Sequence, residues 1–524
     1  MLFNSYEFIF LFLPLTLVGA LYLGRRKEPW LVTAWLNVAS LFFYGWWNPP
    51  YLWLIASSIM VNYLIGRRLL NEGAGRSERK WTLIAGIGVN LSFLGYFKYA
   101  AFFIENWSTL TGFELHIAPI ILPIAISFFT FTQIAYLVDA YRGEVRDNDF
   151  LRYCLFVTFF PHLIAGPIVH HRELIPQFAR KGLCRLRLKA VAVGVTIFVI
   201  GLFKKVVLAD GVAQYSTPVF DAARDGAILS FIDAWGGALA YTFQLYFDFS
   251  GYSDMAIGLA RMFNVRLPIN FNSPYKAVNI IEFWRRWHMT LSRFFREYLY
   301  IPLGGNRRGI PRQYANLLGT MFLVGLWHGA GWTFIVWGGM HGASLLINHA
   351  WRRFRQFMGQ DLQQSSLFGR GMARLVTFLA VIVGWVFFRA EDCDVAVHML
   401  QSMLGSNGVS LPESLSGRIG VLEEWLTEQN ITFHGLLNSK VVDWHSGIIW
   451  IVILLLMSWY APNTQEIMCR FRPAINIYQT ELSNSWGAWL TWKPTPAWAL
   501  AGSILALWGI LSLTQMSEFL YFRF

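Results

Sequence analysis

Residues 325–342, GLWHGAGWTFIVWGGMHG, form an almost wholly apolar stretch with two histidines, His328 and His341, each directly before a glycine. Between Arg312 and His341, His328 is the only side chain that titrates near neutral pH. Gly329 and Gly331 allow a helix break and the close approach of another group. An ionisable side chain in a membrane segment is a candidate for a functional site. Residue type alone favours the other interpretation, a buried histidine that bonds a backbone carbonyl.

The composition of the 524-residue chain fits a protein embedded in a membrane. Apolar residues make up 55% of it and charged residues only 14%, whereas a soluble domain carries about 25% charged residues. The 24 tryptophans suit a chain that crosses two interfacial belts many times. A span needs about 20 apolar residues. Candidate spans lie near 7–24, 30–47, 51–66, 82–98, 118–138, 153–170, 190–208, 230–247, 314–330, 332–349, 372–389, 446–461 and 495–515. We therefore expect an all-α integral membrane protein, a polytopic helical bundle.

The net charge of +12 comes largely from basic runs between the apolar stretches. Such runs are typical of cytoplasmic loops, which follow the positive-inside bias, so we expect no nucleic-acid partner. The basic runs at 25–27 and 67–80 lie on either side of two candidate spans, so both runs can be cytoplasmic. One candidate span precedes the first run, which places the N-terminus on the non-cytoplasmic side. No basic segment precedes the first apolar stretch and no cleavage site follows it, which predicts a retained span rather than a signal peptide.

The centre of the sequence is too polar for lipid-facing spans. Residues 270–312 carry arginines, aromatic residues, glycines and prolines, yet they lie between candidate spans. Polar backbone at membrane depth survives only where it is buried in protein or lines a wet cavity. We therefore predict re-entrant or interfacial helices at 270–312, and a second such segment at 159–178, around a central funnel. We treat 1–524 as a single membrane domain in which 405–445 forms a soluble-looking insert.

The densest polar cluster is EFWRRWH at residues 282–288. Glu282 stands three and four residues before Arg285 and Arg286, so on a helix part of the cluster is expected to neutralise itself. For the arginines, an interfacial helix with Trp and Arg at the lipid headgroups is an equally good interpretation. For His288 a functional role is favoured.

Polar residues also end the candidate span at 230–247, in the sequence QLYFDFSGYSD at 244–254. Asp248, Ser250 and Asp254 can cap a helix or line a water-filled cavity. Ser250 lies in no nucleophile-elbow sequence, so a serine hydrolase is only weakly indicated.

We predict no metal site. The four cysteines show neither metal-ligand spacing nor a disulfide framework. His162, His170 and His171 lie near one another with only Glu173 as a further ligand, and their spacing matches no known site type.

His341 lies 13 residues after His328. On a continuous helix it would be roughly 20 Å away along the axis and about 220° around it. The two histidines could then share a reaction centre only if the helix breaks, and we assign His341 a structural role.

The ordered sequence blocks resemble the membrane-bound O-acyltransferase family. The resemblance rests on FWRRWH at 283–288 and LWHGA at 326–330. It is supported by GYFKY at 95–99, FPHLIAGP at 160–167, YFDFSGYSD at 246–254, LGGNR at 303–307, GWVFFRAE at 384–391 and FLYFRF at 519–524. These blocks span essentially the whole chain, and they are most similar to the alginate-type branch of the family. The insert at 405–445 departs from the pattern.

The resemblance implies roles for particular residues. The family's essential histidine corresponds to His328, and its second characteristic polar position corresponds to His288, where many lipid-modifying relatives carry Asn. Further residues are expected to bind substrate, namely Asp248, Ser250, Asp254, Arg285, Asn306 and Trp327. Family members move an acyl group from a cytoplasmic thioester to an acceptor that is reached through the membrane. In the alginate-type branch the group is acetyl, and a separate periplasmic acetyltransferase of the SGNH-hydrolase type places it on the polymer.

We accordingly expect an O-acetyltransferase of the bacterial inner membrane, with lipid around it, acetyl-CoA or another acetyl thioester as donor substrate, and no bound cofactor. His328 can act as a general base or carry the acetyl group as acetyl-imidazole, and His288 can orient the acceptor or stabilise the oxyanion. The favoured acceptor is alginate. Alternatives are peptidoglycan, cellulose and D-alanyl transfer to teichoic acid, a transporter of an intact acyl donor or glycan, and a scaffold for periplasmic enzymes.

Overall fold

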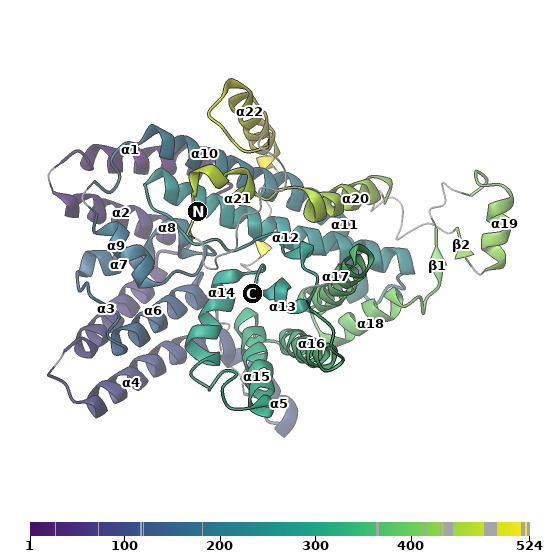
Figure 1. The fold of residues 1–524 in the computed structure, drawn as a ribbon, viewed down its shortest axis with the longest axis horizontal. Coiled ribbons are helices and arrows are strands. Elements are labelled where there is room, and N and C mark those ends of the chain that lie inside the picture. Colours follow the sequence, from purple (N-terminus) through teal and green to yellow (C-terminus); the bar gives the residue numbers. More distant parts are fainter. Residues whose placement is uncertain are drawn as a thin grey trace.

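The computed structural model of the chain describes all residues except 27, 72, 116–117, 119, 181, 363–365, 412–415, 430, 434–443, 476–489, 515–518 and 521–524. This part is built almost entirely of helices (Figure 1). Within it, Arg76–Thr111, Leu188–Arg224 and Leu367–Arg389 are helical, long and apolar enough to cross a membrane. Shorter apolar helices lie at Glu7–Leu23, His445–Tyr460 and Pro496–Leu511. The predicted all-α membrane architecture is confirmed.

Helix α12 (Phe231–Met262) runs through the middle of the molecule (Figure 1). Ser230 starts it with a capping box, because its hydroxyl accepts the Asp233 N–H and the Asp233 carboxylate accepts the Ser230 N–H. Its 32 residues span about 48 Å, and most of its side chains are buried. The helix therefore extends well beyond the span predicted at 230–247, because Asp248 and Asp254, which follow that span, pair with lysines inside the protein.

Helix α10 (Leu188–Phe203) packs against α12 through two pairs of glycines. A Cβ atom on Gly194 would lie 2.6 Å from the carbonyl oxygen of Gly258, and one on Gly201 would lie 2.6 Å from that of Gly251. Such distances leave no room for a side chain. Small residues at a helix crossing in a membrane allow this close approach of two backbones.

Residues close to both ends of the chain pack against helix α12. Phe3 stacks on Tyr252 of α12 with ring centroids 4.7 Å apart, and Phe519 packs on the same ring at 4.6 Å. Leu520 donates its backbone N–H to the Asp248 carboxylate over 3.3 Å. Of the C-terminal block at 519–524, residues 521–524 lie outside the described residues.

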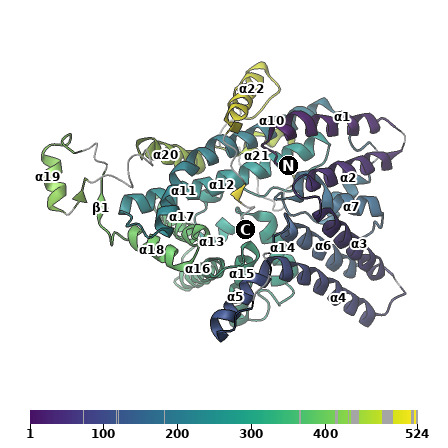
Figure 2. The ribbon, with the colours of Figure 1, turned by 180° about the vertical axis from the view of Figure 1, so that it is seen from behind.

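The N-terminal half contributes a group of helices on one side of α12 (Figures 1 and 2). They are a π-helical turn (Glu7–Phe12) with α1 (Leu13–Leu23), α2 (Pro29–Gly45), α3 (Tyr51–Leu69), α4 (Arg76–Leu94), a π-helical segment (Gly95–Tyr99) with α5 (Ala100–Thr111), and α6 (Ile126–Tyr141). The π-helical segment before α5 meets the end of α15 (Ile310–His328), where Lys98 and Tyr99 bond carbonyl groups of that helix; in Figure 2 the labels of α5 and α15 stand close together.

The two segments predicted as re-entrant or interfacial are broken into short helices. Residues 150–178 form α7 (Phe150–Thr158), α8 (Phe160–Leu163) and α9 (His171–Phe178), so the candidate span at 153–170 is wrong. Residues 270–312 form a 3₁₀ turn (Pro274–Lys276), α13 (Ile280–Trp284), α14 (Met289–Phe295) and a π-helical segment (Arg296–Tyr300) before α15 begins. The prediction that this stretch is no straight lipid-facing helix is confirmed.

Helices α15 and α16 (Trp332–Phe357) form a tight hairpin. The chain breaks at Gly329 and Gly331, as the sequence suggested, and both glycines are extended. A Cβ atom on Gly325 would overlap the carbonyl of Phe334, so the two helices touch through backbone. The hairpin leads to α17 (Leu367–Arg389) and α18 (Cys393–Met403).

The insert at 405–445 projects from the helical body at one end of the molecule (Figure 1). Its described parts are β1 (Val409–Ser410), α19 (Val421–Glu428) and β2 (Ile431–Thr432), and Val409 pairs with Ile431 in a parallel ladder. Residues 412–415, 430 and 434–443 lie outside the described residues. The chain returns to the bundle through α20 (Trp444–Tyr460), α21 (Thr464–Ile467) and α22 (Pro496–Leu511).

Candidate active site

Helix α15 ends at His328, and two side chains from the junction of α4 and α5 hold its last carbonyl groups. Lys98 Nζ donates to the carbonyl oxygens of Trp327 at 2.6 Å and His328 at 3.1 Å. The Tyr99 hydroxyl donates to the backbone carbonyl oxygen of Leu326 at 2.7 Å. The last carbonyls of a helix lack partners within it and carry partial negative charge, so a neighbouring ammonium stabilises them. These contacts fix the helix end that carries His328.

Aromatic rings from three helices surround the His328 imidazole. Its ring centroid lies 4.9 Å from that of Trp327, 5.0 Å from that of Trp337 and 5.1 Å from that of Phe388. The side chain is 2% exposed. The imidazole therefore has little freedom to rotate, and bulk water is kept away from it.

His288 lies next to this cage. Its ring centroid is 6.3 Å from that of His328, with 63° between the ring planes. The residue is fully buried and precedes α14 with φ 40° and ψ 54°, the left-handed region that non-glycine residues rarely adopt. Residues held in such conformations cluster at functional sites, because the surrounding structure must over-determine them.

Asn270 determines which nitrogen of His288 carries hydrogen. Its Oδ1 lies 3.1 Å from His288 Nδ1, and it also accepts the backbone N–H of Thr290 at 3.3 Å and the Thr290 hydroxyl at 2.9 Å. A backbone N–H can only donate, so the shared Asn270 atom must be the oxygen. His288 Nδ1 therefore donates, and in the neutral ring the lone pair lies on Nε2.

Two small cavities are lined by residues of the site, one by His328 and the other by Asn270, the hydrogen-bond partner of His288. The first has a volume of about 50 Å³ and is lined by Lys98, residues 122–128 and His328, among others. The second has a volume of about 10 Å³, close to that of one water probe, and Asp254 and Asn270 help to line it. The first cavity thus reaches His328 directly, and the second reaches His288 through Asn270.

Asp248 and Asp254 are buried, and each faces a lysine from the π-helical segment that follows α10. Lys205 lies 2.8 Å from Asp248 and 2.7 Å from Asp210, and Lys204 lies 2.7 Å from Asp254. These ion pairs join α12 to the end of α10. The aspartates therefore neutralise lysines inside the protein, a role that the sequence analysis did not predict.

Three of the residues expected to bind substrate lie near the histidines. The Trp327 ring contacts the imidazoles of both His288 and His328. Ser250 and Asp254 line the second cavity, and the buried Ser250 hydroxyl has no hydrogen-bond partner among the described residues. Their role in binding stays a prediction.

Two further expected residues, Arg285 and Asn306, lie elsewhere in the structure. Glu282 pairs with Arg286 at 2.8 Å, as the spacing predicted. Arg285 and Asn306 are exposed and line neither of the two cavities. The structure thus does not bring these two residues to the histidines, and a role in binding stays a prediction for them also.

His341 lies closer to the site than a continuous helix would place it. The chain reverses after His328, so that Trp337 contacts both rings, with centroids 5.0 Å from His328 and 4.9 Å from His341. Both histidines therefore contact the same indole. The assumption of a continuous helix was wrong, because Gly329 and Gly331 break it.

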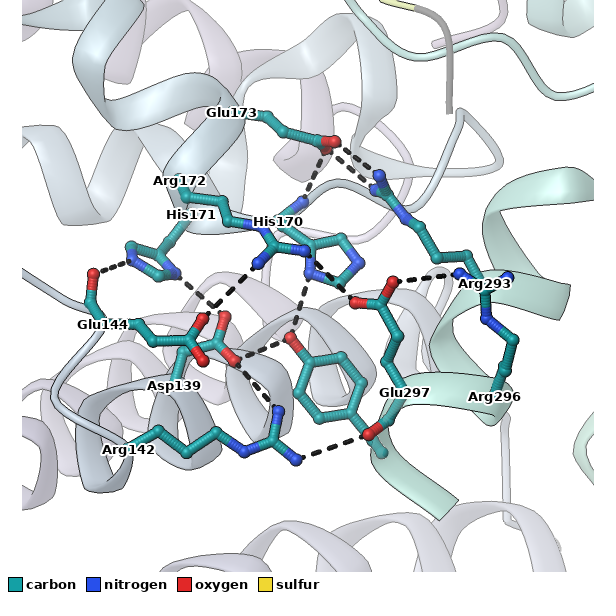
Figure 3. Close-up of polar contacts among 11 residues, drawn as sticks. Asp139, Arg142, Glu144, His170, His171, Arg172, Glu173, Arg293, Arg296 and Glu297 are labelled. Atoms are coloured by element: carbon teal, nitrogen blue, oxygen red, sulfur yellow. Dashed lines mark hydrogen bonds and ion pairs between the residues drawn. The ribbon is translucent and has the colours of Figure 1, made fainter. Parts of the chain in front are cut away.

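A separate polar network joins α6, α9 and the segment after α14 (Figure 3). The Tyr298 hydroxyl donates to Asp139 at 2.9 Å and lies 2.9 Å from His170 Nδ1, while His171 Nδ1 lies 3.1 Å from the other Asp139 oxygen. Burial and the Asp139 carboxylate raise the pKa of the Tyr298 phenol far above its usual value, so the phenol stays a donor. Two of the three histidines that we considered as metal ligands are thus bonded to protein groups.

The same network supports the helix that follows His288. Arg293 of α14 forms a two-pronged ion pair with Glu173 of α9 (Figure 3), and the second prong measures 2.9 Å. Ile168 donates its backbone N–H to the Thr290 hydroxyl at 3.0 Å. Thr290 is also bonded to Asn270, so the segment at 159–178 helps to hold the residue that orients His288.

The sequence analysis missed the roles of Lys98 and Asn270. Lys98 is the only charged residue between Lys80 and Glu105, and an isolated charge in an apolar segment would have marked it as a site candidate. Asn270 gave no comparable signal. It lies in an already polar segment, 18 residues before His288, and only the fold brings the two together.

Comparison with known proteins is consistent with this geometry. Residues 122–384 match the model of the membrane-bound O-acyltransferase family. A peptidoglycan O-acetyltransferase of Helicobacter pylori is 47% identical, over 78% of this chain and 81% of the relative. A probable alginate O-acetylase of Azotobacter vinelandii is 45% identical, over 77% of this chain and 78% of the relative. A probable alginate O-acetylase of Pseudomonas aeruginosa is 43% identical, over 79% of this chain and 76% of the relative. The chain therefore belongs to the membrane-bound O-acyltransferase family and is an acyltransferase embedded in a membrane.

Proposed function

We propose that this acyltransferase passes acetyl groups from a cytoplasmic thioester, acetyl-CoA or another acetyl thioester, across the bacterial inner membrane for the O-acetylation of an exopolysaccharide. The observation that carries the proposal is the pair of buried histidines, His288 and His328, whose ring centroids lie 6.3 Å apart and of which His328 lines a cavity. Imidazole is the side chain whose ordinary pKa suits proton transfer near neutral pH.

Two chemical routes use His328. As a general base, its ring nitrogen takes the proton of an acceptor hydroxyl, whose oxygen attacks the thioester carbonyl; the carbon–sulfur bond breaks and the thiolate leaves with a proton. As a nucleophile, the ring nitrogen attacks the same carbonyl and releases the thiol, and an acceptor hydroxyl then takes the acetyl group from acetyl-imidazole.

His288 has a supporting role in both routes. Asn270 holds its Nδ1 as the donor, so a neutral His288 offers a lone pair on Nε2. This tautomer supports a role in orienting the acceptor hydroxyl by accepting its hydrogen bond. Stabilising the thioester oxyanion would instead require a protonated Nε2.

We propose alginate as the acceptor polymer, with an SGNH-type periplasmic acetyltransferase as the partner that completes the transfer and the N-terminus on the periplasmic side. Peptidoglycan is the second candidate, because a relative named a peptidoglycan O-acetyltransferase shares 47% identity with this chain. Basic loops on the cytoplasmic side would attract an anionic coenzyme.

Reconstitution of the full chain in vesicles tests the reaction. Radiolabelled acetyl-CoA is supplied on one side, an oligosaccharide acceptor on the other, and a His328→Ala protein serves as the matched control. Release of free CoA together with label on the acceptor supports the proposal. Uptake of intact acetyl-CoA without CoA release would establish a transporter and overturn it.

Removal of the gene distinguishes the two polymers. The acetyl content of the secreted exopolysaccharide and of peptidoglycan is measured by NMR in the same cells. Loss from the exopolysaccharide alone supports alginate-type acetylation, whereas loss from peptidoglycan alone transfers the assignment to the second candidate.

A further inference from the structure

A large groove lies between α16 and α17, apart from the histidine site. Its volume is about 940 Å³, near the upper end of the usual range for small-molecule sites of about 300–1,000 Å³. Its walls are largely apolar and include Ile347 and Trp351 of α16 and Met372, Val376 and Ala380 of α17. Several of these side chains are more than half exposed, among them Ile347 and Val376. The groove is therefore open along its apolar side.

One end of the groove is strongly basic. Arg352 and Arg355 lie near the end of α16, and Arg370 lies in the first turn of α17. Arg355 donates to Gln360, whereas no contact within the described part of the chain pairs Arg352 or Arg370 with a carboxylate. Among the residues that the structure describes, no ion pair therefore neutralises Arg352 or Arg370 at this end.

The start of α17 adds to this positive end. Ser366 caps the helix by accepting the Gly369 N–H at 3.0 Å, and both residues line the groove. The free N–H groups of a helix N-terminus carry partial positive charge and favour phosphate. Arginines and helix dipole thus favour an anion at the same place.

We propose that this groove binds an anionic phospholipid. Its phosphate lies against Arg352, Arg355 and Arg370, and its acyl chain lies along the apolar walls. A soluble anion would leave the apolar walls unused, and a lipid without net charge would leave three arginines uncompensated. Basic pockets between membrane helices on the cytoplasmic side are known to suit anionic headgroups.

The dimensions of the groove fit one membrane leaflet. From Arg355 to Ile347 the axial distance on α16 is about 12 Å, and from Arg370 to Ala380 on α17 it is about 15 Å. Half of a hydrocarbon core of about 30 Å is about 15 Å. If the arginines lie at the level of the lipid headgroups, the apolar walls therefore extend into the hydrocarbon core to about the depth of one leaflet. The positive-inside bias places this end at the cytoplasmic leaflet, where anionic lipids attract basic residues.

The bound lipid would also contact the central polar segment. Asn279 and Ile280, at the start of α13, line the inner wall of the groove. Helix α13 leads directly to His288. The bound lipid thus packs against the start of α13, and the same chain segment continues to His288 in the histidine site.

Native mass spectrometry of the full-length protein in neutral detergent tests the proposal. The protein is titrated with phosphatidylglycerol and, separately, with phosphatidylcholine that carries the same acyl chains. Arg352→Gln/Arg370→Gln removes two charges of the groove. Arg67→Gln/Arg68→Gln is the matched control, because it removes two exposed arginines from the end of α3. We expect the wild type and the control to prefer phosphatidylglycerol, and the groove variant to bind it about tenfold more weakly.

A second variant separates a lipid from a free anion. Val376→Trp fills the apolar wall without changing any charge, and it should also weaken phosphatidylglycerol binding several-fold. Soluble glycerol phosphate should not compete with the lipid. An unchanged lipid preference in Arg352→Gln/Arg370→Gln would overturn the proposal. Undiminished binding by Val376→Trp, together with competition by glycerol phosphate, would show an anion site without a lipid chain and would equally overturn it.

Discussion

The side-chain oxygen of Asn270 lies 3.1 Å from His288 Nδ1 and is fixed there by the backbone N–H of Thr290. Asn270→Leu keeps the side-chain size but removes the acceptor, so His288 loses the bond that sets its tautomer. A buried hydrogen bond of this kind contributes about 1–3 kcal/mol when one partner is left unsatisfied. We expect kcat of acetyl transfer to fall about tenfold or more, with a shifted pH–rate profile.

Ser253→Ala is the control for this change. It removes the Ser253 hydroxyl, which accepts from the other end of the Asn270 amide at 3.3 Å, and leaves the oxygen that faces His288 in place. The control should keep most of its activity. An Asn270→Leu enzyme with the wild-type rate and pH profile would show that Asn270 does not position His288.

Removal of His288 itself should be less severe than removal of the group that makes and breaks bonds. His288→Ala is expected to reduce acetyl transfer but to leave residual activity, because a group that orients the acceptor contributes less than the base or nucleophile. Since Asn270 acts through His288, the double variant with Asn270→Leu should be no slower than His288→Ala alone. Wild-type turnover in His288→Ala would remove the residue from the site.

Lys98 stabilises the helix end that carries His328. Lys98→Met removes the ammonium that bonds the carbonyls of Trp327 and His328. Two buried acceptors then lose their partner, so we expect the free energy of unfolding to fall by about 1–3 kcal/mol and acetyl transfer to fall with it. Tyr99→Phe removes a single bond, to Leu326, and should have a smaller effect. Thermal unfolding in detergent and the transfer rate test both. A fully stable and active Lys98→Met protein would contradict this assignment.

Several parts of the architecture could be predicted from sequence because they follow from local chemistry. The scarcity of charge and the repeated apolar stretches indicate membrane helices wherever they occur. Arginines at 285–296 cannot face lipid, which excludes a straight span there. His328 stands out because it is the only group between Arg312 and His341 in the sequence that titrates near neutral pH.

The remaining features depend on contacts that local chemistry does not specify. Asn270 meets His288 only because the chain between them folds back, and His341 approaches His328 only because α16 reverses direction after the glycines. The motifs that contain Arg285 and Asn306 do not state which way their side chains face, and both are exposed. In the case of Asp248 and Asp254, the partner lysines come from another helix.

Lys205 balances two buried carboxylates, Asp248 at 2.8 Å and Asp210 at 2.7 Å. Lys205→Met removes this ammonium from both carboxylates. Breaking one partner of a buried pair typically costs about 3–5 kcal/mol, so we expect low expression and a clear drop in the unfolding temperature. Adding Asp248→Asn and Asp210→Asn should restore part of the stability, because no buried charge then remains unpaired. Equal instability of the single and triple variants would indicate that packing of the lysine stem, rather than charge, is what matters.

His328 carries the functional assignment, and two substitutions separate chemistry from structure. His328→Ala should abolish acetyl transfer, while the protein still inserts and reaches normal levels. Gln has a similar size and keeps hydrogen-bonding groups, but it cannot accept a proton near neutral pH or carry an acetyl group. If His328 were only a structural donor, His328→Gln would largely restore function. We expect it instead to be as inactive as Ala, whether the histidine is the base or the acetyl carrier. His341→Gln is the matched control, since that ring is also buried and also contacts Trp337 but has a structural role and should not enter the reaction. A well-expressed His328→Gln protein that acetylates at the normal rate would refute the proposed chemistry.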